Sequence, residues 1–214
     1  MEISQVLLKA LGETLYMVLI STFLAVIIGF IFAIILVLTN EEGLKPSKFI
    51  NSVLGTIINT LRSFPFVILM IAIFPLTKII VGKTIGTTAA IVPLTIGAAP
   101  FATRVIESAL VEVDKGVIEA AKSFGASDMQ IIFKVMVKEA LPAIVSGITL
   151  TVISVVGYSA MAGAIGGGGL GDVAIKYGYY RFKVDLMVYT ILILIVLVQA
   201  FQGIGNVLYK KLIK

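Results

Sequence analysis

Long apolar segments separated by short polar ones are the dominant pattern of this chain. Runs with at most one charged residue cover positions 14–38, 53–74, 85–106, 141–165 and 186–208. Each run has 22 to 25 residues, and about 20 predominantly apolar residues suffice to cross a bilayer as an α-helix. The pattern therefore predicts an all-α integral membrane protein with five transmembrane helices.

Proline and polar residues set the expected boundaries of these helices. Residues 3–12, which precede the first span, predict a short interfacial helix with Lys9 on its polar side. Pro65 predicts a kink in the second span and Pro75 predicts its end, because proline lacks a backbone N–H and clashes with the preceding turn. Residues 77–83 are then expected to form a short loop.

Composition agrees with a membrane protein and excludes several functions. The 214 residues are 59% hydrophobic and 14% charged, with a mean hydropathy of +1.10, whereas soluble domains carry about 25% charged residues. We expect one membrane domain over residues 1–214. The absence of Cys and His excludes disulfides and sites built on those residues, so we expect no catalytic residue, metal or cofactor. No G-x-x-x-x-G-K-[ST] motif occurs, and energy from ATP has to come from another subunit.

The segment over residues 107–140 is the exception to the apolar pattern. Its first 33 residues carry ten charged side chains, which predicts a helical loop exposed to water. Asp114 is placed to cap a first short helix, and Gly125 to end it, because glycine tolerates the left-handed conformation. Ser127 and Gln130 have the spacing of a capping box that opens a second helix.

The basic residues predict how the spans are oriented. If this loop is cytoplasmic, nine lysines gather on the inner face and six Lys or Arg on the outer face, with Arg62 and Arg104 inside spans. Cytoplasmic segments carry the excess of positive charge. An odd number of spans then predicts an outside N-terminus and a cytoplasmic C-terminus. The net charge of +5 is explained by these flanking lysines, and we expect no nucleic acid partner.

The chemistry of the loop centres on Glu119, Ala120, Ala121 and Gly125. One interpretation is a solvated amphipathic helix whose charges merely keep it in water, since Glu and Ala are good helix formers. The other is a docking helix, flat at its two alanines and charged at Glu119. The spacing Glu-Ala-Ala-x-x-x-Gly favours docking, and it resembles the coupling loop of the membrane subunits of ATP-binding-cassette importers.

The resemblance extends over nearly the whole chain, to the methionine-importer permeases within that family. It is carried by Arg62–Phe66, Ala89–Phe101, Met129–Ile131, Val156–Met161 and Gly168–Gly171. The resemblance implies a homodimer in the cell membrane, two copies of a cytoplasmic ATPase, and an extracytoplasmic methionine-binding lipoprotein. One position departs from the family: Lys138 replaces a proline. We therefore expect the helix to continue toward the fourth span before it breaks.

Two alternatives to methionine import stay open. The same architecture serves importers of other amino acids or small polar solutes. A non-transport membrane scaffold, whose charged loop docks an unrelated cytoplasmic partner, also fits the pattern.

Three further features each have a structural and a functional interpretation. Tyr158, Ser159 and Met161 either pack in the fourth span or line the substrate path, where Met161 would meet its copy on a dimer axis and close the route. The six glycines of residues 163–171 form either a packed or flexible loop or an outer lip that receives substrate. Arg62 is expected to snorkel to the inner interface or to find a structural partner, and Arg104 to pair with Glu107 at i, i+3.

Overall fold

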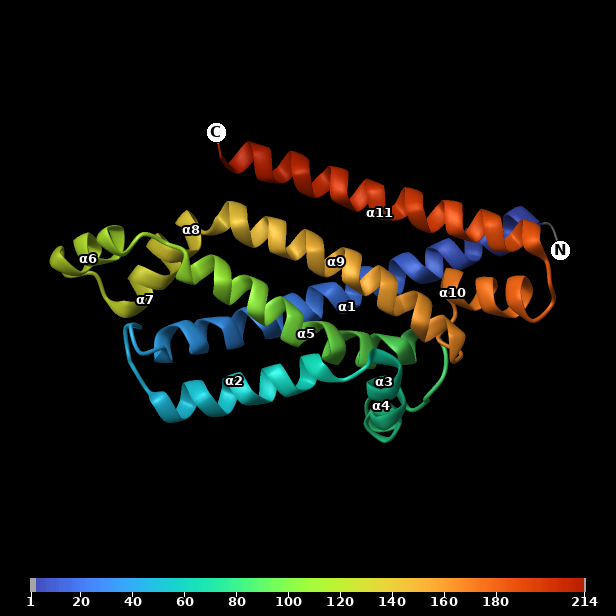
Figure 1. Ribbon diagram of the computed structural model, residues 1–214, viewed down its shortest axis with the longest axis horizontal. Coiled ribbons are helices and arrows are strands. Elements are labelled where there is room, and N and C mark those ends of the chain that lie inside the picture. The colour runs from blue at the N-terminus through green and yellow to red at the C-terminus, as the bar shows by residue number, and fades with distance from the viewer. Residues whose placement is uncertain (1–2, 214) are drawn as a thin grey trace.

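The structure, a computed structural model, describes residues 3–213, and within this range every regular element is a helix. Four helices are long and apolar enough to cross a membrane: α1 (Ile3–Thr39), α5 (Thr87–Val111), α9 (Leu141–Ala164) and α11 (Val184–Leu212). They run roughly along the long axis of the molecule (Figure 1). The all-α prediction is confirmed for these residues. Lys214, counted above among the inner lysines, lies outside the described residues.

Helix α1 is continuous, and the separate interfacial helix expected over residues 3–12 is wrong. The polar residues that indicated a boundary have partners within the fold. Glu13 is half-buried, and its Oε2 accepts a hydrogen bond of 2.8 Å from the backbone N–H of Gly169. Thr14, which is buried, accepts one of 2.9 Å from the N–H of Leu170. These residues therefore need no break in the helix to satisfy their polar groups.

The second span is broken into two helices. Helix α2 (Lys48–Ser63) is followed by α3 (Phe66–Ala72), and the two axes form an angle of 106°. Phe64, the residue before Pro65, is extended with φ −73° and ψ 130°, because the proline ring disfavours a helical conformation there. Pro65 thus causes a break where a kink was expected. Among residues 3–213, four helices could span a membrane, or five if this bent pair counts as one span.

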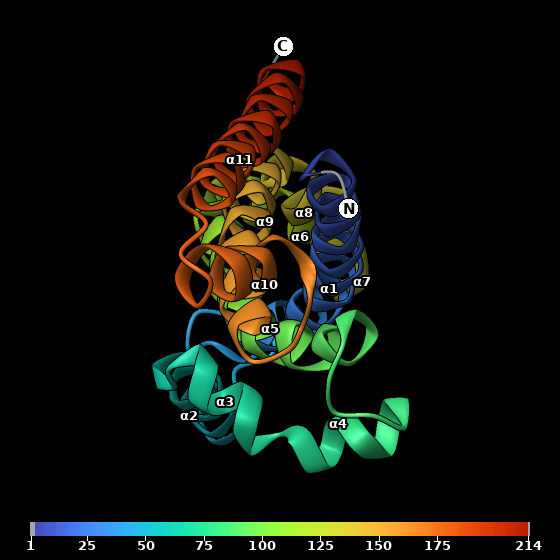
Figure 2. The ribbon, with the colours of Figure 1, turned by 90° about the vertical axis from the view of Figure 1, so that its right-hand side faces the viewer.

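Pro75 begins a helix where it was expected to end one. It lies in the first turn of α4 (Phe74–Val81), where its missing N–H would have had no intrahelical partner. Helix α4 therefore covers most of the expected loop 77–83, and it ends at Gly82 with φ +81°. In Figure 2, which looks along the bundle, α3 and α4 extend sideways from it.

The core forms where α1 crosses α5 and α9. Met17, Leu94 and Val155 are fully buried at this crossing. Gly29 of α1 allows the closest approach: a β-carbon there would lie 2.8 Å from the Cβ of Ala102 and 2.9 Å from the backbone nitrogen of Thr103. Small residues bring helix backbones together in this way in membrane bundles, and the crossing fixes α5 against α1.

The glycine-rich segment is packed tightly against the bundle. It forms α10 (Gly169–Val173) and a π-helical stretch, η2 (Ala174–Tyr179). Leu170 is fully buried, and a β-carbon on Gly163 would collide with the backbone of Gly171 and Asp172. The tight packing expected of this segment is therefore confirmed.

Helix α11 lies at the edge of the bundle and buries little of its surface. Only 11% of its most apolar stretch is buried, and it packs mainly on α9, where Gly205 meets the side chain of Thr149. Its exposed residues are mostly apolar, and the exposed charged ones lie near its two ends. A helix that is apolar on its exposed face is expected to face lipid or another membrane helix.

Candidate functional site

The charged loop folds as a capped helix followed by a second helical segment. The Oδ1 of Asp114 accepts hydrogen bonds from the N–H groups of Gly116 and Val117, at 2.8 and 3.3 Å, and opens α6 (Lys115–Ser123). Gly125, with φ +76°, follows the end of α6. Both predicted helix signals are confirmed. The left-handed glycine turns the chain back toward the bundle.

Ser127 forms the predicted capping box. Its hydroxyl accepts from the N–H of Gln130, whose side chain accepts from the N–H of Ser127 at 2.9 Å. This box opens a run of α7 (Asp128–Gln130), the π-helical η1 (Ile131–Met136) and α8 (Val137–Glu139). The run continues past Lys138, as expected from the missing proline. It breaks at Ala140, however, just before the fourth span that it was expected to enter, and Pro142 lies in the first turn of α9.

The two halves of the loop differ in burial. Ile131, Ile132 and Met136 of η1 are buried in a core cluster with the ends of α1 and α5. No residue of α6 is buried. Glu119 and Ala120 are exposed, and Ala121 is half-buried against the same cluster. The second half of the loop therefore anchors it, while α6 presents Glu119 and Ala120 outward.

Phe124 is a candidate residue that the sequence pattern did not single out. It caps the C-terminus of α6 and is 92% exposed. Val117 and Met129, on the same loop, are exposed as well. A large aromatic side chain left in water at the end of a polar helix is typical of a protein contact. The signal available in the sequence was an aromatic residue directly before Gly125, the glycine that follows α6.

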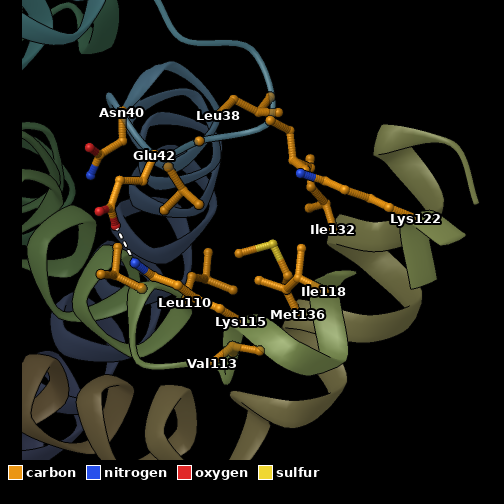
Figure 3. A pocket seen from close by; sticks show the side chains of 14 residues that line it. Leu38, Asn40, Glu42, Leu110, Val113, Lys115, Ile118, Lys122, Ile132 and Met136 are labelled. Carbon is orange, nitrogen blue, oxygen red and sulfur yellow. Dashed lines mark hydrogen bonds and ion pairs between the residues drawn. The ribbon is translucent and has the colours of Figure 1, made fainter. Parts of the chain in front are cut away.

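Helix α6 is also tied to the loop between α1 and α2. The Nζ of Lys115 donates to the Oε2 of Glu42 at 2.5 Å across the rim of a pocket of about 90 Å³ (Figure 3). The hydrogen bond from Lys115, and then its charge, hold the pKa of Glu42 below its usual value. The same hydrogen bond and charge raise the pKa of Lys115. The contact therefore connects the start of α6 to the loop between α1 and α2.

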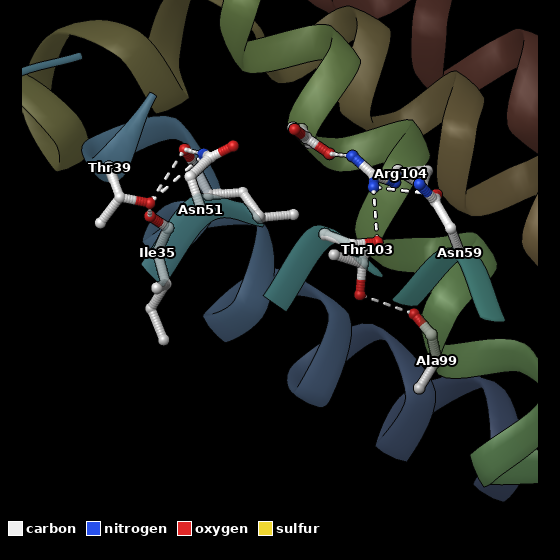
Figure 4. A network of polar contacts seen from close by, with 10 residues as sticks. Ile35, Thr39, Asn51, Asn59, Ala99, Thr103 and Arg104 are labelled. Carbon is white, nitrogen blue, oxygen red and sulfur yellow. Dashed lines mark hydrogen bonds and ion pairs between the residues drawn. The ribbon is translucent and has the colours of Figure 1, made fainter. Parts of the chain in front are cut away.

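A second polar contact joins α2 to α5. Arg104 pairs with Glu107 at 2.7 Å, as predicted, and also donates to the side-chain oxygen of Asn59 at 2.9 Å and the carbonyl of Gly55 at 3.2 Å (Figure 4). The cross-helix contacts were not predictable, because they depend on the packing of α2. In the same view, Asn51 of α2 donates to the carbonyl of Leu36 in α1 at 2.9 Å. Polar groups thus hold α2 to both neighbours.

The three predicted path residues of α9 face different ways. Met161 is 46% exposed, so it is not a buried packing residue of the protomer. Tyr158 is half-buried and stacks on Phe66 of α3. Ser159 is buried, and its hydroxyl donates to the carbonyl of Val156 at 2.7 Å. The structure therefore brings Tyr158 and Met161 to the surface of the bundle and leaves Ser159 inside it.

Within residues 3–213, no three Asp or Glu side chains come together in a group that could hold a metal ion. The described structure thus has the features of a multi-pass helical membrane protein with a structured loop at one end. Residues 25–214 match the family described as the binding-protein-dependent transport system inner membrane component. The chain belongs to this family, and it is a transport component of the membrane.

Relatives of known name and structure agree with this assignment. The chain is 53% identical, over 97% of its length and 92% of the relative's, to the probable D-methionine transport system permease protein MetI of Vibrio cholerae. It is 46% identical to the methionine import system permease protein MetP of Bacillus subtilis, covering 81% of this chain and 78% of MetP. A chain from inward-facing crystals of the MetNI methionine ABC transporter superposes with a TM-score of 0.96 at 40% identity, over 97% and 96% of the two chains.

Proposed function

We propose that this chain is the permease subunit of an ATP-driven importer of methionine. The proposal that an ATPase drives the permease rests on α6. This capped helix at one end of the bundle presents Glu119, Ala120 and Phe124 outward. Methionine as the substrate is supported by relatives that are 46 to 53% identical and carry methionine in their names.

The partner that α6 docks is a cytoplasmic ATPase, present in two copies. The permease has no phosphate-binding loop of its own, so ATP hydrolysis belongs to that partner. Phe124 would enter an apolar groove of the ATPase, with Glu119 facing a basic residue and Ala120 and Ala121 allowing close contact. Gly125 sets the angle at which α6 projects. An extracytoplasmic methionine-binding lipoprotein would deliver the substrate on the opposite side of the membrane.

The permease works as a homodimer whose copies meet along the outer half of α9. Gly157, Met161 and Ala164 are all exposed and recur at i, i+4 and i+7, which places them on one face of the helix. Small residues at this spacing let two helices approach closely. The Met161 side chains of the two copies would then meet near the dimer axis and close the path, beside Tyr158.

The orientation places the coupling loop of residues 107–140 in the cytoplasm. With the α2–α3 pair counted as one broken span, five spans put the N-terminus outside and the C-terminus inside. The positive charge of the sequence supports this direction. The two ends of the chain lie toward opposite ends of the long axis, with α6 at the end nearer the C-terminus (Figure 1).

In this scheme ATP binding draws the two α6 helices together. Their movement reaches the spans through three connections: the chain into α5, the Lys115–Glu42 contact with the α1–α2 loop, and the run of α7, η1 and α8 into α9. The spans of the two copies rock against each other, and access to the path changes from the inner to the outer face. Hydrolysis and release then return the complex to its first state.

Uptake of labelled methionine by the complex in proteoliposomes tests the proposal. We expect accumulation that requires ATP, the ATPase and the binding protein, and competition by unlabelled methionine but not by histidine. Accumulation of another amino acid in place of methionine would assign a different substrate to the same architecture. If the permease co-purifies with no ATPase that carries a phosphate-binding loop, the scaffold interpretation replaces transport.

A further inference from the structure

Arg62 occupies a position in the fold that the proposed scheme does not use. It is the last residue but one of α2, directly before the 106° break to α3. At 1.5 Å per residue, it lies roughly 21 Å along the helix from Lys48, in a hydrocarbon layer about 30 Å thick. With Lys48 placed at the inner interface, as the proposed orientation has it, Arg62 lies too far along α2 to snorkel back to that interface. Charged residues this deep in a membrane protein usually serve a function.

Arg62 of α2 and Arg104 of α5 differ in their hydrogen-bond and ion-pair partners. Arg104 has a carboxylate, an amide oxygen and a carbonyl within hydrogen-bonding distance. Arg62 lies three residues beyond Asn59, one turn further along α2. Within residues 3–213 no carboxylate lies within ion-pairing distance of Arg62. Its guanidinium carries five donors in a planar fork that fits a carboxylate in a bidentate manner. The fold thus neutralises one arginine and leaves the other available.

The surroundings of Arg62 form a pocket of about 200 Å³. Its walls are mostly aromatic and come from α3, α5, α9 and the break before α3: Phe64, Phe66, Phe101 and Tyr158, with Leu61, Leu69 and Gly97. The pocket is large enough to hold a small solute such as a free amino acid. Gly97 leaves room over Phe66, since a β-carbon there would lie 3.0 Å from the Phe66 ring.

The position of the pocket relates it to the substrate path. Tyr158 lines the pocket and stacks on Phe66 with ring centroids 4.8 Å apart. Met161 follows three residues later on α9, one turn nearer the outer end of that helix. A solute in the pocket would therefore lie next to the proposed gate, on its inner side.

We propose that this pocket is a substrate-binding site within the membrane, in which Arg62 binds the carboxylate of an α-amino acid and the aromatic walls hold its apolar side chain. The inference rests on the proposed function, because it takes the solute to be an amino acid. A thioether side chain suits these walls, since sulfur makes favourable contacts with aromatic rings. The guanidinium supplies charge-assisted hydrogen bonds in place of those that the carboxylate loses with water on entering the membrane.

The test compares Arg62→Gln and Arg62→Lys with the unaltered permease, each assembled with its ATPase and binding protein in proteoliposomes. For Arg62→Gln we expect the KM for methionine uptake to rise about tenfold or more, as for a lost charge-assisted contact. Arg62→Lys keeps the charge but not the fork and should lie between the two. Lys78→Gln, which removes a charge from α4 outside the pocket, should leave KM unchanged.

A binding assay separates this inference from the proposed function. The permease–ATPase complex in nanodiscs, without binding protein, should retain labelled methionine, and methioninamide, which lacks the carboxylate, should compete about tenfold less well. Equal competition by both compounds, or an Arg62→Gln variant with unchanged KM, overturns the pocket while leaving methionine import intact. If the unaltered complex takes up no methionine at all, the proposed function fails, whatever the variants do.

Discussion

Phe66 at the start of α3 and Tyr158 in the C-terminal half of α9 stack with their ring planes 10° from parallel and their centroids 4.8 Å apart. This stack is a direct link between the broken second span and the helix that carries Met161. Aromatic pairs contribute about 0.5–1.5 kcal/mol beyond the area that they bury. We expect Tyr158→Phe to keep the stack, and Tyr158→Ala to lose it.

A double-mutant cycle measures the strength of this link. With Phe66→Leu as the second change, Tyr158→Leu should show a coupling free energy of about 1 kcal/mol. Unfolding of the permease in mixed detergent micelles is the readout. If the unfolding free-energy changes of the two single variants simply add in the double variant, the two rings stabilise the protein independently.

Met161 gives a test that separates the gate from ordinary packing. Because its side chain is 46% exposed, Met161→Ala leaves no closed cavity and should cost well under the 2–5 kcal/mol typical of a buried Met→Ala change. It should instead raise methionine flux or ATP hydrolysis in the absence of the binding protein. Met70→Ala is the control, since Met70 is 1% exposed, and it should destabilise without causing a leak. A Met161→Ala variant that loses stability but shows no leak would contradict the proposed gate.

Gly125 should respond to substitution through its backbone conformation. Nothing lies within 4 Å of a β-carbon placed on it, but its φ of +76° is unfavourable for residues with a side chain. We expect Gly125→Ala to cost roughly 1–2 kcal/mol locally and to weaken ATPase binding. Gly125→Asn should be milder, because asparagine tolerates this region.

Gly203 provides the matched control for Gly125. It lies inside α11, also with nothing within 4 Å of an added β-carbon, but in helical conformation. Gly203→Ala should therefore be neutral or slightly stabilising. Equal effects at the two positions, measured as ATPase affinity and thermal unfolding, would remove the conformational explanation.

The contact between Glu42 and Lys115 predicts how the attachment of α6 depends on pH. The pKa of Glu42 is lowered by the hydrogen bond with Lys115, so its contribution is present above the usual value of 4.5 and is lost as the pH falls below that. The pKa of Lys115 is raised, so its contribution is present below 10.5 and is lost as the pH rises above that. Between these limits α6 should stay equally well attached.

A spin label can follow this attachment, because the chain has no native cysteine. With Ser123→Cys labelled, α6 should become more mobile below about pH 4.5 and, at any pH, at high salt. Adding Glu42→Gln should make it mobile throughout and insensitive to acid. Mobility that changes with pH in the Glu42→Gln background would assign the effect to another group.

Arg104 should matter more for stability than the exposed cations do. Its side chain and that of Glu107 are 26% and 17% exposed, and Arg104→Gln leaves Glu107 without its ion-pair partner. We expect a loss of about 1.5–3 kcal/mol. Lys45→Gln breaks the pair with Asp128, whose side chains are 72% and 38% exposed, and should cost at most about 1 kcal/mol. Unfolding in mixed micelles compares them, and similar losses would mean that the contacts of Arg104 across to α2 contribute little.

The sequence was sufficient for the features that depend on local chemistry. The long spans follow from apolar runs of membrane length, and the caps at Asp114 and Ser127 follow from side chains that satisfy free N–H groups nearby. The i, i+3 pair of Arg104 and Glu107 is local in the same sense. Each of these signals lies within one continuous stretch of the sequence, and the caps and the ion pair lie within one helical turn.

The sequence was insufficient where distant segments decide the structure. The sequence predicted a separate helix over residues 3–12, but Glu13, just beyond it, accepts a hydrogen bond from the N–H of Gly169 in α10, far along the chain. Pro65 indicated a change of direction but not its angle, which depends on how α3 packs against α5 and α9. The exposure of Met161 and the pocket at Arg62 likewise arise only when four segments are assembled.

The π-helical turns of η1 have a consequence for how α6 is aimed. A π-turn contains one residue more than an α-turn, and one residue in an α-helix corresponds to a rotation of roughly 100°. Deleting a single residue between Ile131 and Met136 would allow an ordinary helix to form and would swing everything before it by about that angle. Substitutions within η1 leave the residue count unchanged. The orientation of α6 therefore depends on the number of residues in η1 as well as on Gly125. We expect it to tolerate point mutations within η1 far better than insertions or deletions.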